Sequence, residues 1–103
     1  MLSDMFGLKK TTIERIQKVF QQYPEIEKAF IYGSRAMGNY RPGSDIDLTL
    51  LGEQLNYAQF SKIETALDDL MLPYSIDLSL FHHIDNQELI DHIHREGKLF
   101  YKK

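Results

Sequence analysis

The stretch "IYGSRAMGNYRPGSDIDLTL", from Ile31 to Leu50, decides how the fold is interpreted. An apolar segment stops at Gly33, loop-forming residues follow, and then Asp45 and Asp47 alternate with apolar residues. Alternation with a period of two predicts a β-strand whose two faces differ. Asp45 and Asp47 are therefore expected on one face of this strand, where their like charges repel each other.

The composition is that of a small globular protein. The chain has 103 residues, which predicts one domain over 1–103. It is 43% hydrophobic and 26% charged, and it contains no Cys. The lack of Cys excludes disulfides and thiolate metal sites, so any metal ion must be bound by Asp, Glu or His.

The net charge of −3 leaves no broad cationic surface to hold a nucleic acid backbone. The N-terminal segment has no apolar run typical of a signal peptide, and no run of about 18 apolar residues indicates a membrane span. We therefore expect a cytoplasmic protein that binds neither polymeric nucleic acid nor a membrane.

The rest of the chain predicts alternating helices and strands. Apolar residues at helical spacing indicate three helices, and short apolar or alternating segments indicate four strands. Polar residues before the helices are candidate N-caps. The predicted order is helix (from Thr11 or Thr12 to before Pro24), strand (28–32), a loop from Gly33, strand (44–51), helix (from Asn56 to before Pro73), strand (74–81), helix (from Asn86 to Gly97) and strand (98–101).

The strand over 74–81 repeats the pattern of the strand that carries Asp45 and Asp47, with Asp77 among its alternating polar residues. If the two strands are neighbours, their apolar faces share the core, and Asp77 joins the face of the other two acids. The expected architecture is an α/β or α+β fold, a mixed sheet with helices packed on one face, the apolar one.

Three carboxylates without a sulfur ligand suit a hard cation such as Mg²⁺ or Mn²⁺, which commonly binds substrate phosphates as well. Gly33 and Ser34 fit such a substrate. The glycine lets the backbone approach a ligand, and Ser34 is a candidate cap of a short helical turn whose N–H groups face a phosphate. Arg35 and Arg41 are candidates for further phosphate contacts.

Gly33-Ser34, ten intervening residues and Asp45-Ile46-Asp47 resemble the signature of the polymerase-beta-like nucleotidyltransferases. The short form "GSRAMGNYRPGSDIDL" is typical of the minimal nucleotidyltransferase (MNT) branch, which includes the antitoxin partners of HEPN-type toxins. The resemblance covers nearly the whole chain, since the preceding helix, the following helix and a third acid on a strand, Asp77, fall in the family's order. It implies a single palm-like domain.

The resemblance also implies residue roles. Gly33 and Ser34 would hold the β- and γ-phosphates of a nucleoside triphosphate, and Asp45 and Asp47 would ligate two Mg²⁺ ions, with Mn²⁺ as the alternative. Asp77 would share the second metal and accept the proton of the acceptor hydroxyl. The candidate nucleotide-binding residues are Gly33, Ser34, Arg35 and Ser44.

In the toxin-linked branch, the implied reaction is transfer of AMP from ATP to a tyrosine of the toxin, which silences it. Because the predicted elements are all used in one sheet and its helices, we expect a second, largely helical protein encoded nearby to present the acceptor. Two alternatives stay open: an antitoxin that acts by binding alone, and a small-molecule nucleotidyltransferase with a separate substrate-binding subunit. The sequence leaves open the base preference, the acceptor, the number of nucleotides transferred and whether the assembly is a homo- or hetero-oligomer.

The histidines are interpreted as surface residues rather than as ligands. His82 and His83 are adjacent at the end of a predicted strand, so their side chains are expected on opposite faces. His92 and His94 are two positions apart on a predicted helix and do not share a face.

Overall fold

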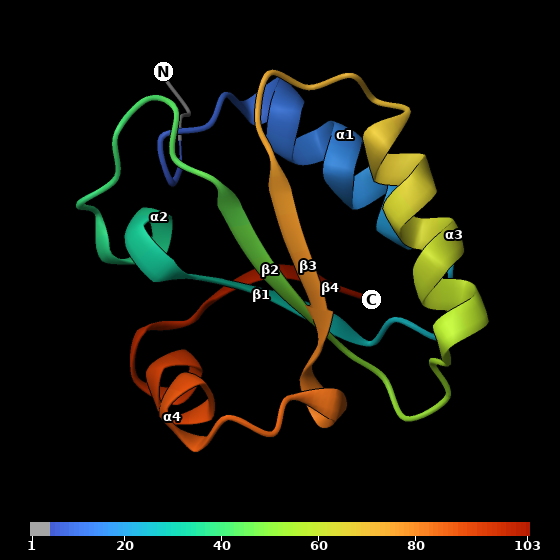
Figure 1. The fold of residues 1–103 in the computed structure, drawn as a ribbon. Helices are drawn as coiled ribbons and strands as arrows, with labels where there is room; N and C mark the ends of the chain where they lie inside the picture. The colour runs from blue at the N-terminus through green and yellow to red at the C-terminus, as the bar shows by residue number, and fades with distance from the viewer. Residues whose placement is uncertain (1–4) are drawn as a thin grey trace.

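The computed structural model describes residues 5–103 and places their strands in one mixed sheet (Figure 1). The strand order is β3-β2-β1-β4, with β2 and β3 parallel and the other neighbours antiparallel. The predicted mixed α/β fold is therefore confirmed. The strands are β1 (Lys28–Tyr32), β2 (Ile46–Leu51), β3 (Ile76–Leu80) and β4 (Lys98–Lys102).

Helices lie on both sides of this sheet (Figure 1). Their bounds are α1 (Lys10–Gln21), α2 (Gly33–Met37), α3 (Tyr57–Asp68) and α4 (Gln87–Glu96). The long helices α1 and α3 pack side by side on one face, as predicted, whereas α4 lies on the opposite side and contacts β1 and α2. Among residues 5–103, no helix has both the length and the apolar character needed to cross a lipid bilayer.

The main core lies between the sheet and the two long helices. Ile16 and Phe20 of α1 and Ile63 of α3 are fully buried against β-strand residues such as Leu48. Burying a large apolar side chain contributes about 1.5–3 kcal/mol, so this layer supplies most of the driving force for folding. The apolar side of the predicted β2 strand faces this core, and its polar side is turned away from it.

Two of the four predicted helix caps are confirmed. The side chain of Asn56 accepts the Gln59 N–H at 2.9 Å, and the side chain of Asn86 accepts the Leu89 N–H at 3.2 Å. The prediction for the first helix is wrong. α1 begins at Lys10, its N-cap is Lys9 without a side-chain hydrogen bond, and the two threonines lie inside its first turn.

The segment predicted as a loop after β1 begins with the short helix α2, Gly33–Met37, at the place where a short helical turn was expected. Glycines in the left-handed region stand at both ends of it: Gly33 has a φ of +72° and Gly38 a φ of +86°. Gly38 ends the helix by donating its N–H to the Ser34 carbonyl at 2.9 Å. Ser34 is thus part of the first turn, and its predicted role as the N-cap falls to Tyr32, which makes no side-chain cap bond.

Candidate active site

The site is built on a row of three side chains that crosses the sheet. Tyr32 of β1 lies directly opposite Asp47 of β2, and Asp47 lies directly opposite Asp77 of β3. Directly opposite residues of paired strands project from the same face of a sheet. Asp45 stands two residues before Asp47 and is exposed. Asp47 and Asp77 therefore lie on one face, away from α1 and α3, as predicted, whereas Asp45 precedes β2 and is near enough for its charge to raise the pKa of Asp47.

Gly33 adjoins this row because β1 runs antiparallel to β2, so the end of β1 meets the start of β2. Its φ of +72° is a conformation that side chains rarely adopt. A β-carbon added at this position would collide with Oδ2 of Asp47. The glycine that starts α2 thus lets the backbone lie directly against the carboxylate.

Burial raises the pKa of the Asp47 carboxyl above its ordinary value of 3.8, and the negative charges of Asp77 and Asp45 raise it further. His92, when it is protonated, and Arg35 act in the opposite direction with smaller effect. The carboxylate of Asp47 is therefore partly buried and lies close to the carboxylates of Asp77 and Asp45. Such an arrangement costs stability and is common in sites that bind cations.

The donor set fits a hard divalent cation, because it consists of carboxylates and includes no thiolate. A cation would also relieve the repulsion that raises the Asp47 pKa. Within residues 5–103, no three His, Asp or Glu side chains are gathered closely enough to enclose a metal ion by themselves. The acids share one face without closing around one point, so a cation at this face would need further ligands from water or substrate.

Hydroxyl groups occupy the same face behind the acids. Ser79 Oγ donates to Oγ1 of the fully buried Thr49 at 2.9 Å. Burial raises the pKa of Tyr32, a hydrogen bond with Ser79 lowers it, and the nearby carboxylates raise it. The polar face therefore has two parts: a buried hydroxyl network, and the acids at the end where β2 and β3 begin.

Arg35 does not project into this site. The side chain is only 2% exposed, and its guanidinium donates to backbone carbonyls at distances of 2.8 to 3.2 Å. The acceptors are the carbonyls of Phe6, Pro42 and Ser44. Its carbon Cζ also lies 5.2 Å and 5.0 Å from the ring centroids of Tyr40 and Tyr74.

The prediction that Arg35 contacts phosphate is thus revised, because a buried guanidinium bonded to carbonyls holds the surrounding loop together. Ser44 takes part in the same loop: its carbonyl accepts from Arg35, and its Oγ accepts the Arg41 N–H at 2.8 Å. Arg41 itself is exposed. Of the predicted nucleotide-binding residues, Gly33 lies against Asp47 and Ser34 follows it in the first turn of α2, whereas Arg35 and Ser44 hold the loop that precedes Asp45.

His92 was expected on the surface and instead reaches the site. Its Nε2 accepts the N–H of Gly33 at 3.0 Å, and its ring meets that of Tyr32 edge to face at a centroid distance of 6.1 Å. The two residues joined by the hydrogen bond are 59 positions apart. No local pattern in the sequence predicts this contact, because it depends on where α4 packs against β1 and α2.

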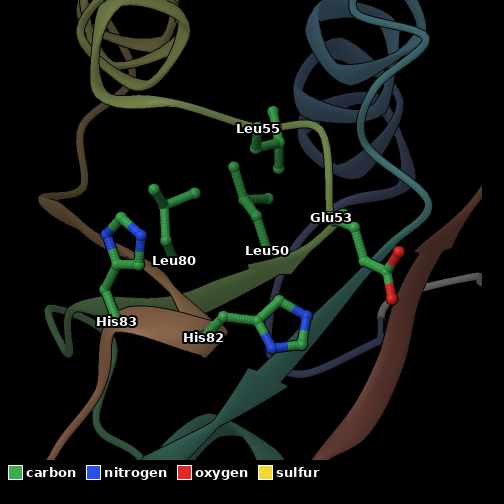
Figure 2. Close-up of a pocket in the computed structure, with 7 residues that line it drawn as sticks. Leu50, Glu53, Leu55, Leu80, His82 and His83 are labelled. Atoms are coloured by element: carbon green, nitrogen blue, oxygen red, sulfur yellow. The ribbon is translucent and has the colours of Figure 1, made fainter.

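A cavity of about 250 Å³ lies at the other end of the sheet, where β2 and β3 end (Figure 2). Its lining residues are Leu50, Gly52, Glu53, Leu55, Leu80, His82 and His83. The two histidines belong to a short 3₁₀ turn and are exposed, so the expectation that they end a strand on opposite faces is wrong. Because the acids stand at the start of both strands, this cavity is separate from the candidate site.

Comparisons with solved structures identify similar folds. A toxin-antitoxin structure with AMP-PNP has a TM-score of 0.71 at 19% identity, covering 88% of this chain and 73% of the other. The MntA-HepT toxin-antitoxin structure gives 0.67 at 16% identity, covering 92% and 74%. A tri-AMPylated Shewanella oneidensis HEPN toxin in complex with MNT antitoxin gives 0.67 at 17% identity, covering 91% and 72%. No curated protein matches the chain by sequence.

A protein-family comparison extends the likeness from the fold to the sequence. The family model described as "Polymerase beta, Nucleotidyltransferase" matches residues 14–103, which include the glycine turn and all three acids. The match spans most of the chain and includes Gly33, which lies against Asp47, and Asp77, which lies opposite Asp47 on the same face of the sheet. This chain belongs to the polymerase beta nucleotidyltransferase family.

Proposed function

We propose that the chain transfers a nucleotide, AMP from ATP, to a hydroxyl group of a partner protein and acts as an antitoxin. The observation that carries the proposal is the placement of Asp47 opposite Asp77 with its carboxylate against the Gly33 backbone. A triphosphate with its cations needs carboxylate ligands next to a backbone turn that is open to phosphate oxygens. The family to which the chain belongs supports the same reaction.

In this proposal, Ser34 binds the β- and γ-phosphates at the glycine turn, because the Gly33 N–H is already donated to His92 and Gly33 contributes its backbone shape. Asp45, Asp47 and Asp77 would hold two Mg²⁺ ions, or Mn²⁺ in their place. When bound, the cations neutralise the charge of the triphosphate and lower the pKa of the acceptor hydroxyl. Asp77 accepts the hydroxyl proton. The acceptor oxygen forms a bond to the α-phosphorus as the bond to pyrophosphate breaks, and the protein contributes mainly by positioning.

Arg35 and Ser44 serve the proposed site indirectly. The buried guanidinium ties the loop that precedes Asp45 to the segment around Phe6. A loop held in this way presents Asp45 and the first turn of α2 in a fixed relation, which reduces the reorganisation needed when substrate binds. We therefore propose that these two residues shape the nucleotide site without contacting the nucleotide.

The acceptor is proposed to come from a second protein. Asp45 and Asp77 are exposed, so a hydroxyl group reaches them from outside the chain. Similar folds occur in antitoxins bound to their toxins, and one of those toxins is AMPylated. These likenesses support a HEPN-type toxin as the partner and one of its tyrosines as the acceptor. Because the proposed donor is ATP, we also propose that the reaction takes place in the cytoplasm.

Incubation of the chain with ATP labelled at the α-phosphate, Mg²⁺ and the product of the neighbouring gene tests the proposal. Label is expected on the partner protein, and Asp45→Asn combined with Asp47→Asn is expected to abolish it. Asp85→Asn, which removes an exposed acid outside the site, is the matched control and should label normally. Toxin neutralisation that survives the double substitution without any labelling would instead show an antitoxin that acts by binding alone.

A further inference from the structure

His92 contacts both residues at the junction where β1 passes into α2. Its Nε2 accepts the Gly33 N–H at 3.0 Å, and its ring packs edge to face on Tyr32 with an interplanar angle of 76°. The residue is partly buried and comes from α4, the helix on the side of the sheet opposite α1 and α3. It thus links α4 to the start of the glycine turn.

The hydrogen bond satisfies a backbone group that its own helix leaves without a partner. N–H groups in the first turn of a helix have no intrahelical acceptor. Tyr32, the N-cap of α2, makes no side-chain cap bond, so the imidazole of a distant helix takes over that role for Gly33. Acceptance by Nε2 requires its lone pair, which places the ring hydrogen of neutral His92 on Nδ1.

The orientation of the Gly33 peptide also affects the contact between Gly33 and Asp47. Gly33 lies against Oδ2 of Asp47 and has a φ of +72°, so a rotation of this peptide would move the backbone that supports the carboxylate. The same peptide sets the direction of the Ser34 amide that follows it. By accepting the Gly33 N–H, His92 therefore influences both the Asp47 carboxylate and the Ser34 amide.

We propose that His92 is a positioning residue of the nucleotide site. It holds the Gly33 peptide so that the backbone of the glycine turn and the Asp47 carboxylate are arranged for a nucleoside triphosphate before the substrate arrives. This role rests on the proposed nucleotidyltransferase function. It adds a residue of α4 to a site otherwise formed by β1, α2, β2 and β3.

Three variants separate the hydrogen bond from the packing of the ring. His92→Phe keeps an aromatic ring against Tyr32 but offers no acceptor to Gly33. His92→Gln offers Oε1 as an acceptor in place of Nε2. His94→Phe is the matched control, because His94 is exposed on the same helix and its ring packs on Phe81 instead of the site.

The first measurement needs no nucleotide. Amide hydrogen exchange of Gly33, followed by NMR in the whole chain, reports whether its N–H remains bonded. We expect exchange to speed up about tenfold or more in His92→Phe, to return toward the native rate in His92→Gln, and to stay unchanged in His94→Phe. Native protection of Gly33 in His92→Phe would overturn the proposal.

The second measurement is the steady-state rate as a function of ATP concentration. We expect KM for ATP to rise about tenfold in His92→Phe with a smaller change in kcat, and to recover in His92→Gln. An unchanged KM in a variant that has lost Gly33 protection would overturn the positioning role. A native chain that binds no ATP would overturn the proposed function itself, and the exchange result distinguishes that failure from the absence of the His92 bond.

Discussion

The carboxylate of Asp47 lies so close to Gly33 that any β-carbon at position 33 would collide with Oδ2 of Asp47. The family's glycine and the central acid of the site are therefore coupled by contact as well as by their spacing in the sequence. A side chain at position 33 would have to displace the carboxylate, and a displaced carboxylate would no longer hold the position that the proposed metal site requires.

Gly33→Ala is expected to lower stability and abolish nucleotidyl transfer. The positive φ alone costs a non-glycine residue roughly 1–2 kcal/mol, and displacement of Asp47 adds to this cost. The free energy of unfolding from urea titration measures the first effect, and labelling of the partner protein measures the second.

Gly38→Ala is the matched control for this substitution. Gly38 also has a positive φ, +86°, but a β-carbon there would meet nothing within 4 Å. It should show a similar strain of roughly 1–2 kcal/mol and retain transfer activity. Equal loss of activity in both variants would mean that strain in α2, and not the contact with Asp47, explains the result.

Much of the sheet could be predicted because alternation is a local signal. The strand over 28–32 is observed with the predicted bounds, and the predicted alternation placed Asp47 and Asp77 on one face. That placement follows because two strands joined by a helix that packs on one face must turn their apolar sides toward it. The acids could be grouped without knowing any distance between them.

The parts that were not predicted depend on contacts between distant segments. Arg35 binds backbone carbonyls, which every residue has, so no residue type marks its partners. His92 reaches Gly33 only because α4 docks beside β1. A short helical turn at Ser34 was expected, but its start at Gly33 was not, since a glycine after an apolar segment also marks the end of a strand.

Arg35→Lys is expected to destabilise the fold by roughly 2–4 kcal/mol, because a buried carbonyl left without its donor costs about 1–3 kcal/mol. One ammonium group cannot reach the carbonyls of both Phe6 and Ser44, which the guanidinium binds from different nitrogens. Urea titration measures this loss. A substrate-contact role would predict the opposite pattern, with stability unchanged and only the KM for ATP increased.

Arg41→Lys is the control for Arg35→Lys, because Arg41 lies in the same loop and is exposed. Its stability should stay within about 0.5 kcal/mol of the native chain, as is usual for surface substitutions. Equal destabilisation by the two substitutions would show that the loop tolerates no change of arginine, and the buried hydrogen bonds of Arg35 would not be the cause.

The raised pKa of Asp47 predicts a specific dependence of stability on pH. The folded chain binds the Asp47 proton more tightly than the unfolded chain does, so ionisation of this carboxyl opposes folding. The contribution of Asp47 to the stability of the fold is most favourable when the pH is below 3.8, the ordinary pKa of the carboxyl. This contribution is lost as the pH rises from 3.8 through the raised pKa of the folded chain. Asp47→Asn should therefore be more stable than the native chain at neutral pH and should lack transfer activity.

The difference in melting temperature between the native chain and Asp47→Asn, measured from acid to neutral pH, isolates this contribution from other carboxyls. The difference should favour Asp47→Asn increasingly as pH rises and should then level off. Asp77→Asn removes one of the charges that raise the pKa of Asp47. When the same comparison is made in chains that carry Asp77→Asn, the increase in the melting-temperature difference should therefore occur at lower pH. A pH-independent difference would show that the Asp47 pKa is unaltered by folding.

Mg²⁺ should stabilise the native chain and have less effect on Asp47→Asn, because a bound cation would relieve the repulsion among the three acids. At ten times its dissociation constant, a ligand that binds only the folded state contributes about 1.4 kcal/mol. For a domain of this size that corresponds to an increase in melting temperature of roughly 5–10 °C. Thermal melts with Mg²⁺, and with EDTA added afterwards to reverse the shift, measure the effect.

Asp85→Asn should respond like the native chain, since Asp85 is exposed and lies outside the row of acids. An equal shift in Asp47→Asn would place the cation elsewhere on the protein and would remove the metal site from the proposed mechanism.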